Sequence, residues 1–329
     1  MKIYLAGAGN KIQHIRNFQE LDGVERVVIS DLYPWSYGNF VADASYLLPR
    51  FDAPDFFEKF DAMYRAERFD VCLPVHDSAL LHFSRNRARL ARYPFHLAMN
   101  PAETVAIVSD KIATAKFFDR LGLPAPRTYT VAQFLALERH DFPYFVKPRY
   151  IDLRGTEMQL YRKVEGAGDV ESVLAAMRAR QELYVVQEHV GGTEINVDFF
   201  CDARGTLKSS VAVKRLAMGA GRGIARGEIH LERDFSDVVA RIVAGTRLVG
   251  ANQLQLFIGA EGGMKLMEIN GRFSGSSVLV KAAGVNYFDY FVRMLRGEEI
   301  DIREKPGYLY MTSWDCPHFF RDSPAIGMP

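Results

Sequence analysis

The sequence has few of the residues that crosslink small secreted folds or build structural metal clusters. Its three cysteines, Cys72, Cys201 and Cys316, are odd in number and lack the close spacing of a zinc motif. This pattern argues against a disulfide framework and against a structural zinc site. A long apolar run is also missing, and the segment from Met1 to Gly9 leads directly into a strand pattern. We therefore expect a cytoplasmic protein with no cleaved leader.

An excess of charge of either sign is likewise missing. Lysine and arginine together number 41, aspartate and glutamate 40, and the net charge is +1 without any long block of like charge. We therefore do not expect nucleic acid or a membrane surface as a partner. The expected partner is a small molecule. The 329 residues, 48% hydrophobic and 25% charged, exceed what one hydrophobic core usually organises, so two or three subdomains are expected.

The first hundred residues alternate strand and helix patterns. Lys2 to Ala6 is typical of a buried strand, Ile12 to Leu21 of a helix, and Val27 to Ser30 of a second strand, which together form a Rossmann-like half. The turn between the first two, residues 7–10, has two glycines but not the third glycine of the dinucleotide fingerprint. We interpret this turn as structural.

The segment from Ala251 to Ser277 organises the rest of the chain. Two apolar runs, Gln253 to Ile258 and Met264 to Ile269, flank a glycine-containing turn and predict an antiparallel hairpin. Polar side chains interrupt this hairpin at three positions that can share one face of the sheet. They are Gln255, Glu268 and Asn270.

One carboxylate and two amide oxygens on one face suit a hard cation such as Mg²⁺. Arg272 follows Asn270 by two residues, and its guanidinium could bind a phosphate through two hydrogen bonds. The alternative interpretation is an exposed hairpin face with ordinary polar residues.

Two lysines lie next to segments that are expected to be buried, where a charged side chain is uncommon. Lys111 begins an amphipathic pattern that runs to Leu121, with Ser109 as the expected N-cap, and Lys147 ends the apolar run that starts at Phe142. For Lys111 the alternative is a solvated surface residue.

A loop rich in glycine and arginine is expected after the strand Lys208 to Lys214. It spans residues 215–227 and contains Arg215 and Arg226. Basic flexible loops bind phosphates, including those of nucleic acids, but no aromatic platform accompanies this one. The same loop could also be mobile surface.

Several of these segments, taken in order, resemble the ATP-grasp enzymes. The motifs are MEINGRFSGSS preceded by Gln255, FPYFVKPR around Lys147, SDKIATAKFFDRLGLPAPRTY from Ser109, VVQEHVGGTEINVDFF from Val185 and KRLAMGAGRGIARGEI from Lys214. The similarity covers nearly the whole chain and is strongest to the carbamoyl-phosphate-synthase-like and amino-acid ligase branches. It implies an α/β fold with a Rossmann-like domain over 1–108, a first ATP-grasp lobe with a helical linker over 109–190, and a C-terminal lobe over 191–329.

The resemblance also implies roles for particular residues. Lys111 and Lys147 would contact ATP phosphates, Lys147 also the adenine ring, and Glu194 the ribose or the metal side of the nucleotide. The adenine pocket would be formed by Gln187, Glu188 and Val190. The site for Mg²⁺, or for Mn²⁺ as its substitute, would be formed by Gln255, Glu268 and Asn270. The groups that act on the substrate or on the phosphoryl group would be Arg272, Arg215 and Arg226.

The implied activity is an ATP-dependent ligase that joins a carboxylate to an amine through an acylphosphate. Small acids and amines, amino acids or peptides among them, would be its substrates. A bicarbonate-phosphorylating enzyme of carboxylase type and a nucleotide-binding sensor or assembly subunit without turnover are the alternatives. The second is favoured by the loop at residues 149–156, where relatives have a glycine-rich flap and this chain keeps only Gly155.

The C-terminal tail, from Tyr308 to Pro329, is aromatic and without clear periodicity. It is expected either to pack on the core or to join an oligomer contact such as a homodimer. Cys316 and His318 could bind a metal or act as nucleophile and base, although such pairs more often serve packing.

Overall fold

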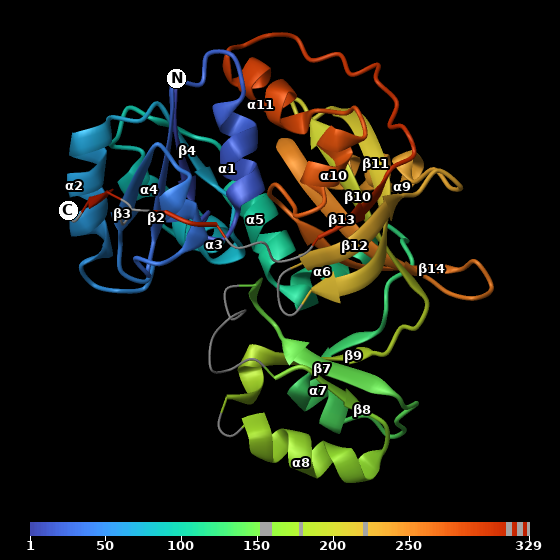
Figure 1. Cartoon of the computed structure of the whole chain (residues 1–329). Coiled ribbons are helices and arrows are strands. Elements are labelled where there is room, and N and C mark those ends of the chain that lie inside the picture. Colours follow the sequence, from blue (N-terminus) through green and yellow to red (C-terminus); the bar gives the residue numbers. More distant parts are fainter. Residues whose placement is uncertain (152–159, 178–179, 220–222, 314–317, 321–324, 328–329) are drawn as a thin grey trace.

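The computed structural model describes residues 1–151, 160–177, 180–219, 223–313, 318–320 and 325–327. Three parts are visible in Figure 1: an N-terminal domain in blue, a small lobe in green at the bottom, and a larger C-terminal lobe in yellow and orange. The predicted α/β architecture, a Rossmann-like domain followed by two α+β lobes, is confirmed.

The N-terminal domain is built on a parallel sheet in the order β16-β3-β2-β1-β4-β5. Its central strands β1 and β2 are buried over most of their length and mainly apolar, as is typical of parallel strands covered on both faces. The elements are β1 (Lys2–Ala6), α1 (Ile12–Gln19), β2 (Arg26–Asp31), η1 (Tyr37–Phe40), β3 (Ala44–Leu47), α2 (Phe56–Glu67), β4 (Val71–Pro74), α3 (Asp77–Arg85), α4 (Arg87–Leu90), β5 (His96–Leu97) and, from the end of the chain, β16 (Ile326–Gly327).

The first lobe is a four-stranded antiparallel sheet in the order β6-β9-β7-β8 with its own small hydrophobic core. Two helices, α5 (Ala102–Ser109) and α6 (Lys111–Arg120), lead into it from the N-terminal domain. The lobe comprises β6 (Thr128–Thr130), α7 (Val131–Leu135), β7 (Tyr144–Pro148), β8 (Arg162–Val164), α8 (Ala167–Met177), η3 (Gln181–Leu183) and β9 (Tyr184–Glu188).

The C-terminal lobe is a six-stranded antiparallel sheet in the order β14-β13-β10-β11-β12-β15. Alternate residues of its central strands pack into an apolar core with α6 and α9, which leaves the opposite face for polar side chains. The elements are β10 (Thr193–Cys201), β11 (Leu207–Gly219), β12 (Gly223–Ile229), α9 (Ser236–Gly245), β13 (Gly250–Ile258), β14 (Met264–Asn270), α10 (Ser277–Ala282), α11 (Tyr287–Leu295) and β15 (Tyr310–Thr312).

The N-terminal domain and the C-terminal lobe share one hydrophobic core. Phe18 on α1 contacts the rings of Phe273, Phe288 and Phe291, and the ring centroids of Phe18 and Phe288 are 5.2 Å apart. Burial of such large aromatic groups contributes strongly to stability. We therefore treat these two parts as the frame of the molecule, on which the first lobe sits.

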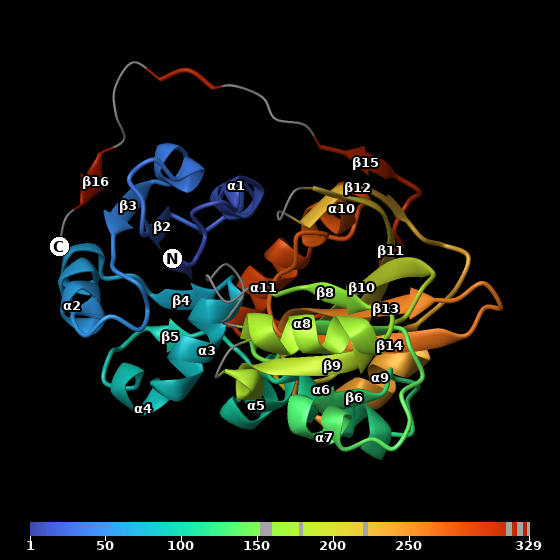
Figure 2. The ribbon, with the colours of Figure 1, turned by 90° about the horizontal axis from the view of Figure 1, so that it is seen from below.

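The tail connects the outer edges of two sheets. β15 pairs with β12 of the C-terminal lobe and β16 pairs with β3 of the N-terminal domain, and Figure 2 shows these two strands far apart. The ring of Phe320, which lies between them in the sequence, is 4.8 Å from that of Phe40 on η1. The prediction that the tail packs on the protein is thus supported; the pair Cys316 and His318 cannot be assessed, because Cys316 lies outside the described residues.

Two local predictions were wrong. The N-cap of α6 is Asp110, whose carboxylate accepts a hydrogen bond from the Ile112 amide at 2.9 Å, because Ser109 still belongs to α5. The expected loop at 215–227 is in its described part a pair of antiparallel strands, in which Arg215 faces Gly227. Glycine weakens strand propensity, but the neighbouring strand β10 supplies the partners that hold β11 extended.

Candidate functional site

A cavity of about 2510 Å³ lies where the three parts meet. Its wall includes Lys11 and His76 of the N-terminal domain, Lys147 of the first lobe, and Glu268 and Arg272 of the C-terminal lobe. Large cavities that collect charged groups from several elements are the usual location of ligand sites. The predicted residues that line this cavity are Lys111, Lys147, Gln187, Glu188, Val190, Glu194, Arg215, Gln255, Glu268, Asn270 and Arg272.

Arg226 is the exception among the predicted residues. It lies on β12, is exposed, and is not part of the cavity wall. The role of Arg226 at the site stays a prediction, at a residue that the structure places outside the cavity wall.

Two rows of polar residues cross the cavity face of the C-terminal sheet. In one row Asn196, Gln255 and Glu268 are register partners across β10, β13 and β14. In the next row Asp198, Gln253 and Asn270 are partners on the same three strands. Because side chains two positions apart leave the same face of a strand, the two rows stand side by side.

Hydrogen bonds fix the orientation of the amides in these rows. Asn270 Nδ2 donates to Gln253 Oε1 at 3.1 Å, and Gln255 Nε2 donates to the Glu194 carboxylate. With each amide nitrogen engaged, the Gln255 oxygen remains to accept, and Asn270 Oδ1 accepts a long hydrogen bond from Arg272 Nη2 at 3.4 Å and keeps its second lone pair. The buried Asn196 Oδ1 has no hydrogen-bond partner within the described part of the chain.

These oxygens suit a magnesium ion. Glu268 supplies a carboxylate, and Asn270, Gln255 and Asn196 supply amide oxygens on the same wall. Within the residues described, no cluster of three or more histidine, cysteine, aspartate or glutamate side chains forms a metal site. Mg²⁺ retains waters and takes phosphate oxygens, so a set with one carboxylate fits a metal that arrives with a nucleotide.

Asp198 anchors the loop that follows the metal row. Its carboxylate is fully buried and accepts hydrogen bonds from the hydroxyl groups of Ser274, Ser276 and Ser277. Burial raises the pKa of Asp198 to about 6, although these hydroxyls and Gln253 act in the opposite direction. The carboxylate thereby ties β10 to the segment 271–277.

We expect Asp198→Ala to lower the free energy of unfolding by about 3 kcal/mol, because three buried hydroxyls lose their acceptor. Denaturant unfolding would measure it. The near-isosteric Asp198→Asn separates the effect of the charge from that of the side-chain shape.

Since the folded-state pKa is raised, native Asp198 binds a proton between about pH 6 and pH 4 that the unfolded chain does not. The wild type therefore gains stability over this range as pH falls. Asp198→Asn should lose this gain, and an unchanged pH dependence would contradict the assignment.

Two of the predicted catalytic arginines are engaged in ion pairs. Arg272 forms two hydrogen bonds to Asp77 at the start of α3, at 2.7 and 2.9 Å, and both side chains are largely buried. Arg215 pairs with Glu194. An arginine held by a carboxylate can still offer its remaining N–H groups to a ligand.

The two lysines of the nucleotide side are both buried in the cavity wall. Lys147 lies on β7, 8% exposed, and Lys111 begins α6, 5% exposed. The N-cap Asp110 forms two hydrogen bonds with Arg149 just after β7, at 2.9 and 2.7 Å, and so holds the start of α6 against β7. Arg149 is therefore held by Asp110, and residues 152–156 of the predicted flap lie outside the described residues.

The end of β9 forms the connection to the C-terminal lobe. Gln187 Nε2 donates to Thr128 Oγ1 at 2.7 Å, and Glu188 Oε2 accepts from the Arg127 amide at 3.1 Å. These bonds hold both side chains toward β6, while Val190 begins the passage into β10. The backbone of this segment is thus the part that could meet a flat heterocycle.

Sequence reasoning missed several residues of the site. Asn196, Asp198 and Gln253 stand two positions from residues that were identified, so the alternation of the strands was a visible signal. Lys11 and Asp77 come from distant turns, and only the tertiary structure brings them beside Arg272. Among the described residues, no helix is both long and apolar enough to cross a bilayer.

Comparison with known proteins agrees with this geometry. Residues 180–313 match a family described as ATP-grasp in the biosynthetic pathway with Ter operon. The fold is similar to that of N5-carboxyaminoimidazole synthetase from Staphylococcus aureus in complex with ADP, with a TM-score of 0.70, 14% identity, and 91% of this chain and 78% of that one covered.

Two further solved structures share the fold. Biotin carboxylase from Campylobacter jejuni, in a β,γ-ATP complex, matches with a TM-score of 0.71 and 15% identity, over 92% of this chain and 72% of that one. L-amino acid ligase from Bacillus licheniformis matches with a TM-score of 0.67 and 14% identity, over 89% and 73%. At these identities the similarity establishes the fold and leaves the substrate open.

Proposed function

We propose that this chain is an ATP-grasp enzyme, an ATP-dependent ligase that joins a carboxylate to an amine through an acylphosphate and releases ADP and phosphate. The observation that carries the proposal is that two sets of groups from different lobes line one cavity. Oxygen ligands of the C-terminal sheet and the buried lysines Lys111 and Lys147 are all in its wall.

The nucleotide would lie between the two lobes. The backbone from Gln187 to Val190 would meet the adenine edge, Glu194 the ribose or metal side, and Lys111 and Lys147 the phosphates, where buried ammonium groups offset negative charge. Bound Mg²⁺ would neutralise charge on the terminal phosphates. Glu268 and Asn270 would hold this ion, with Gln255 and Asn196 beside them.

The reaction itself would depend on positioning. The carboxylate oxygen of the acid attacks the γ-phosphorus, ADP leaves, and the amine then attacks the carbonyl carbon and expels phosphate. Arg272 and Arg215 stand on the cavity wall where charge would develop, and each keeps its orientation through a carboxylate partner. Such a mechanism needs no covalent nucleophile from the protein.

Phosphate release from ATP and magnesium tests the proposal. The full chain would be assayed with bicarbonate alone and with a pool of amino acids, dipeptides and simple carboxylic acids, divided until single compounds remain. We expect stimulation by one acid and one amine, with the amide product seen by mass spectrometry. Arg226→Gln serves as a variant outside the cavity and Glu268→Gln as a variant inside it.

The possible outcomes separate the alternatives. Stimulation by bicarbonate alone would favour a carboxylase-type reaction. Tight ATP binding without stimulation by any compound would favour a nucleotide-binding protein without turnover. Failure to bind ATP would contradict the proposal.

A further inference from the structure

Lys11 is a charged residue of the cavity wall that the nucleotide site does not use. It lies at the start of α1, half-buried, directly after the turn at residues 7–10. Within the described part of the chain its ammonium group has neither a hydrogen bond nor an ion pair. Partial burial of a cation without a counter-ion costs free energy, and a negatively charged ligand in the cavity would offset this cost.

The backbone holds Lys11 firmly in this place. Its amide donates to Ala8 O at 2.8 Å, and its carbonyl accepts from the amides of His14 and Ile15 at 2.9 and 3.1 Å. The next turn of α1 is fixed to the C-terminal lobe, because His14 Nε2 donates to Ser274 O at 2.9 Å. Lys11 therefore keeps its position relative to the segment 271–277.

The charges near Lys11 do not balance. Arg272 and Asp77 are the charged groups whose fields act on it, and these two already neutralise each other in a buried ion pair. His14 is buried, and desolvation keeps its pKa well below the usual value, so it adds no charge at neutral pH. The corner formed by Lys11, Arg272 and Asp77 thus has one positive charge in excess.

This corner adjoins the metal row. Arg272 Nη2 lies 3.4 Å from Asn270 Oδ1, so a ligand held between Lys11 and Arg272 would lie beside the terminal phosphates of a nucleotide bound as proposed above. An acid that accepts a phosphoryl group needs its carboxylate at this location. One positive charge in excess matches one carboxylate.

We propose that Lys11, together with Arg272, binds the reacting carboxylate of the acid substrate, and that this corner is the acid subsite. The inference rests on the proposed ligase function. It assigns the subsite to an organic carboxylate, and it makes Lys11 a substrate-binding residue that does not itself transfer a proton.

The pH dependence of binding follows from the same geometry. Burial and the nearby Arg272 lower the pKa of Lys11 to about 7, and Asp77 offsets this only in part. Below pH 7 Lys11 is charged and binds the carboxylate; above pH 7 it becomes neutral, so KM for the acid rises with pH. A bound carboxylate raises this pKa in return, by linkage.

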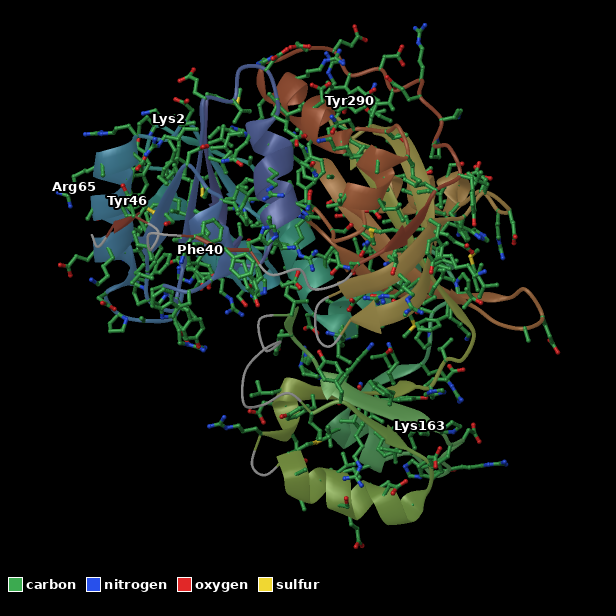
Figure 3. All side chains as sticks on the ribbon, viewed as in Figure 1. Lys2, Phe40, Tyr46, Arg65, Lys163 and Tyr290 are labelled. Atoms are coloured by element: carbon green, nitrogen blue, oxygen red, sulfur yellow. The ribbon has the colours of Figure 1, made fainter. Side chains whose placement is uncertain are left out.

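Three variants of the full chain test the subsite: Lys11→Gln, Lys11→Arg and, as a control, Lys163→Gln. Lys163 lies on β8 of the first lobe, partly exposed and paired with Glu165 (Figure 3). With the acid found by phosphate release, Lys11→Gln should raise KM for the acid about 10- to 100-fold, the range of a charge-assisted hydrogen bond, with kcat and KM for ATP nearly unchanged.

Lys11→Arg separates binding from proton transfer. It should retain much of the affinity for the acid and remove the rise of KM above pH 7, because arginine stays charged. An unchanged KM in Lys11→Gln would overturn the proposal. Loss of kcat in Lys11→Gln and Lys11→Arg alike would overturn it too, since that result would identify Lys11 as a base.

A second measurement needs no turnover. Acetic anhydride would be used to acetylate the wild type near pH 7, with the rate at Lys11 followed by mass spectrometry in sodium acetate and in sodium chloride of equal ionic strength. We expect acetate to protect Lys11 several-fold more than chloride, with Lys163 unaffected. Protection without any ATP turnover would retain the anion subsite and reject the ligase, whereas equal rates in the two salts would reject the subsite.

Discussion

Replacing Glu268 with glutamine should reduce acid-stimulated phosphate release by about 1000-fold, with the fold intact. Glutamine has nearly the same shape, so the register with Gln255 on β13 is kept and only the charge is lost. Glu268 is the carboxylate of the predicted metal set, and its loss leaves only the amides of Gln255 and Asn270 in that set, since Glu194 on the same wall is paired with Arg215. Loss of charge stabilisation of this kind costs several kcal/mol in the transition state, at 1.36 kcal/mol per tenfold.

Nucleotide binding should be measured in parallel, by calorimetry with and without magnesium. In the wild type magnesium should strengthen ATP binding, and in Glu268→Gln this enhancement should largely disappear while binding of metal-free ATP is kept. Gln253→Glu, which adds a carboxylate to the neighbouring row, tests whether position matters as well as charge. Turnover in Glu268→Gln within tenfold of the wild type would contradict the metal assignment.

The sequence predicted the parts of this site that depend on local pattern. The hairpin of β13 and β14 forms as expected, because two apolar runs around a glycine-containing turn have few other solutions. The alternation within these strands then places Glu268 and Asn270 on one face.

Other features depend on contacts between distant segments and were not legible. Asp77 and Arg272 meet across 195 residues, and His14 meets Ser274 across 260. The pairing of β16 with β3 requires the tail to cross from one sheet edge to another, and its two residues have no strand pattern of their own. Periodicity describes one element at a time, so such pairs appear only when the elements pack.

Breaking the ion pair between Asp77 and Arg272 should strongly lower the stability of the folded protein. Arg272→Met should lower the free energy of unfolding by about 3–5 kcal/mol, because it leaves the Asp77 carboxylate, 6% exposed, without its partner. The pair Asp77→Leu with Arg272→Met removes both charges and should recover most of this loss. Denaturant unfolding of the two single variants and the double variant gives the coupling energy.

An exposed pair supplies the matched control. Arg303 and Asp301 are 2.6 Å apart with side chains 88% and 62% exposed, and their removal should change stability by less than about 1 kcal/mol. Additive effects of the Asp77 and Arg272 substitutions would show that the pair does not join α3 to the C-terminal lobe.

Stability and turnover should separate in the double variant. If Arg272 also holds the acid, the double variant Asp77→Leu with Arg272→Met recovers most of the unfolding free energy of the wild type but not its phosphate release. The reason is that leucine and methionine pack against each other but offer no N–H groups to the acid. Recovery of both together would instead assign Arg272 a purely structural role and leave Lys11 as the cation of that corner. Variants of the Asp77–Arg272 pair can thus distinguish its contribution to the free energy of unfolding from its contribution to substrate binding.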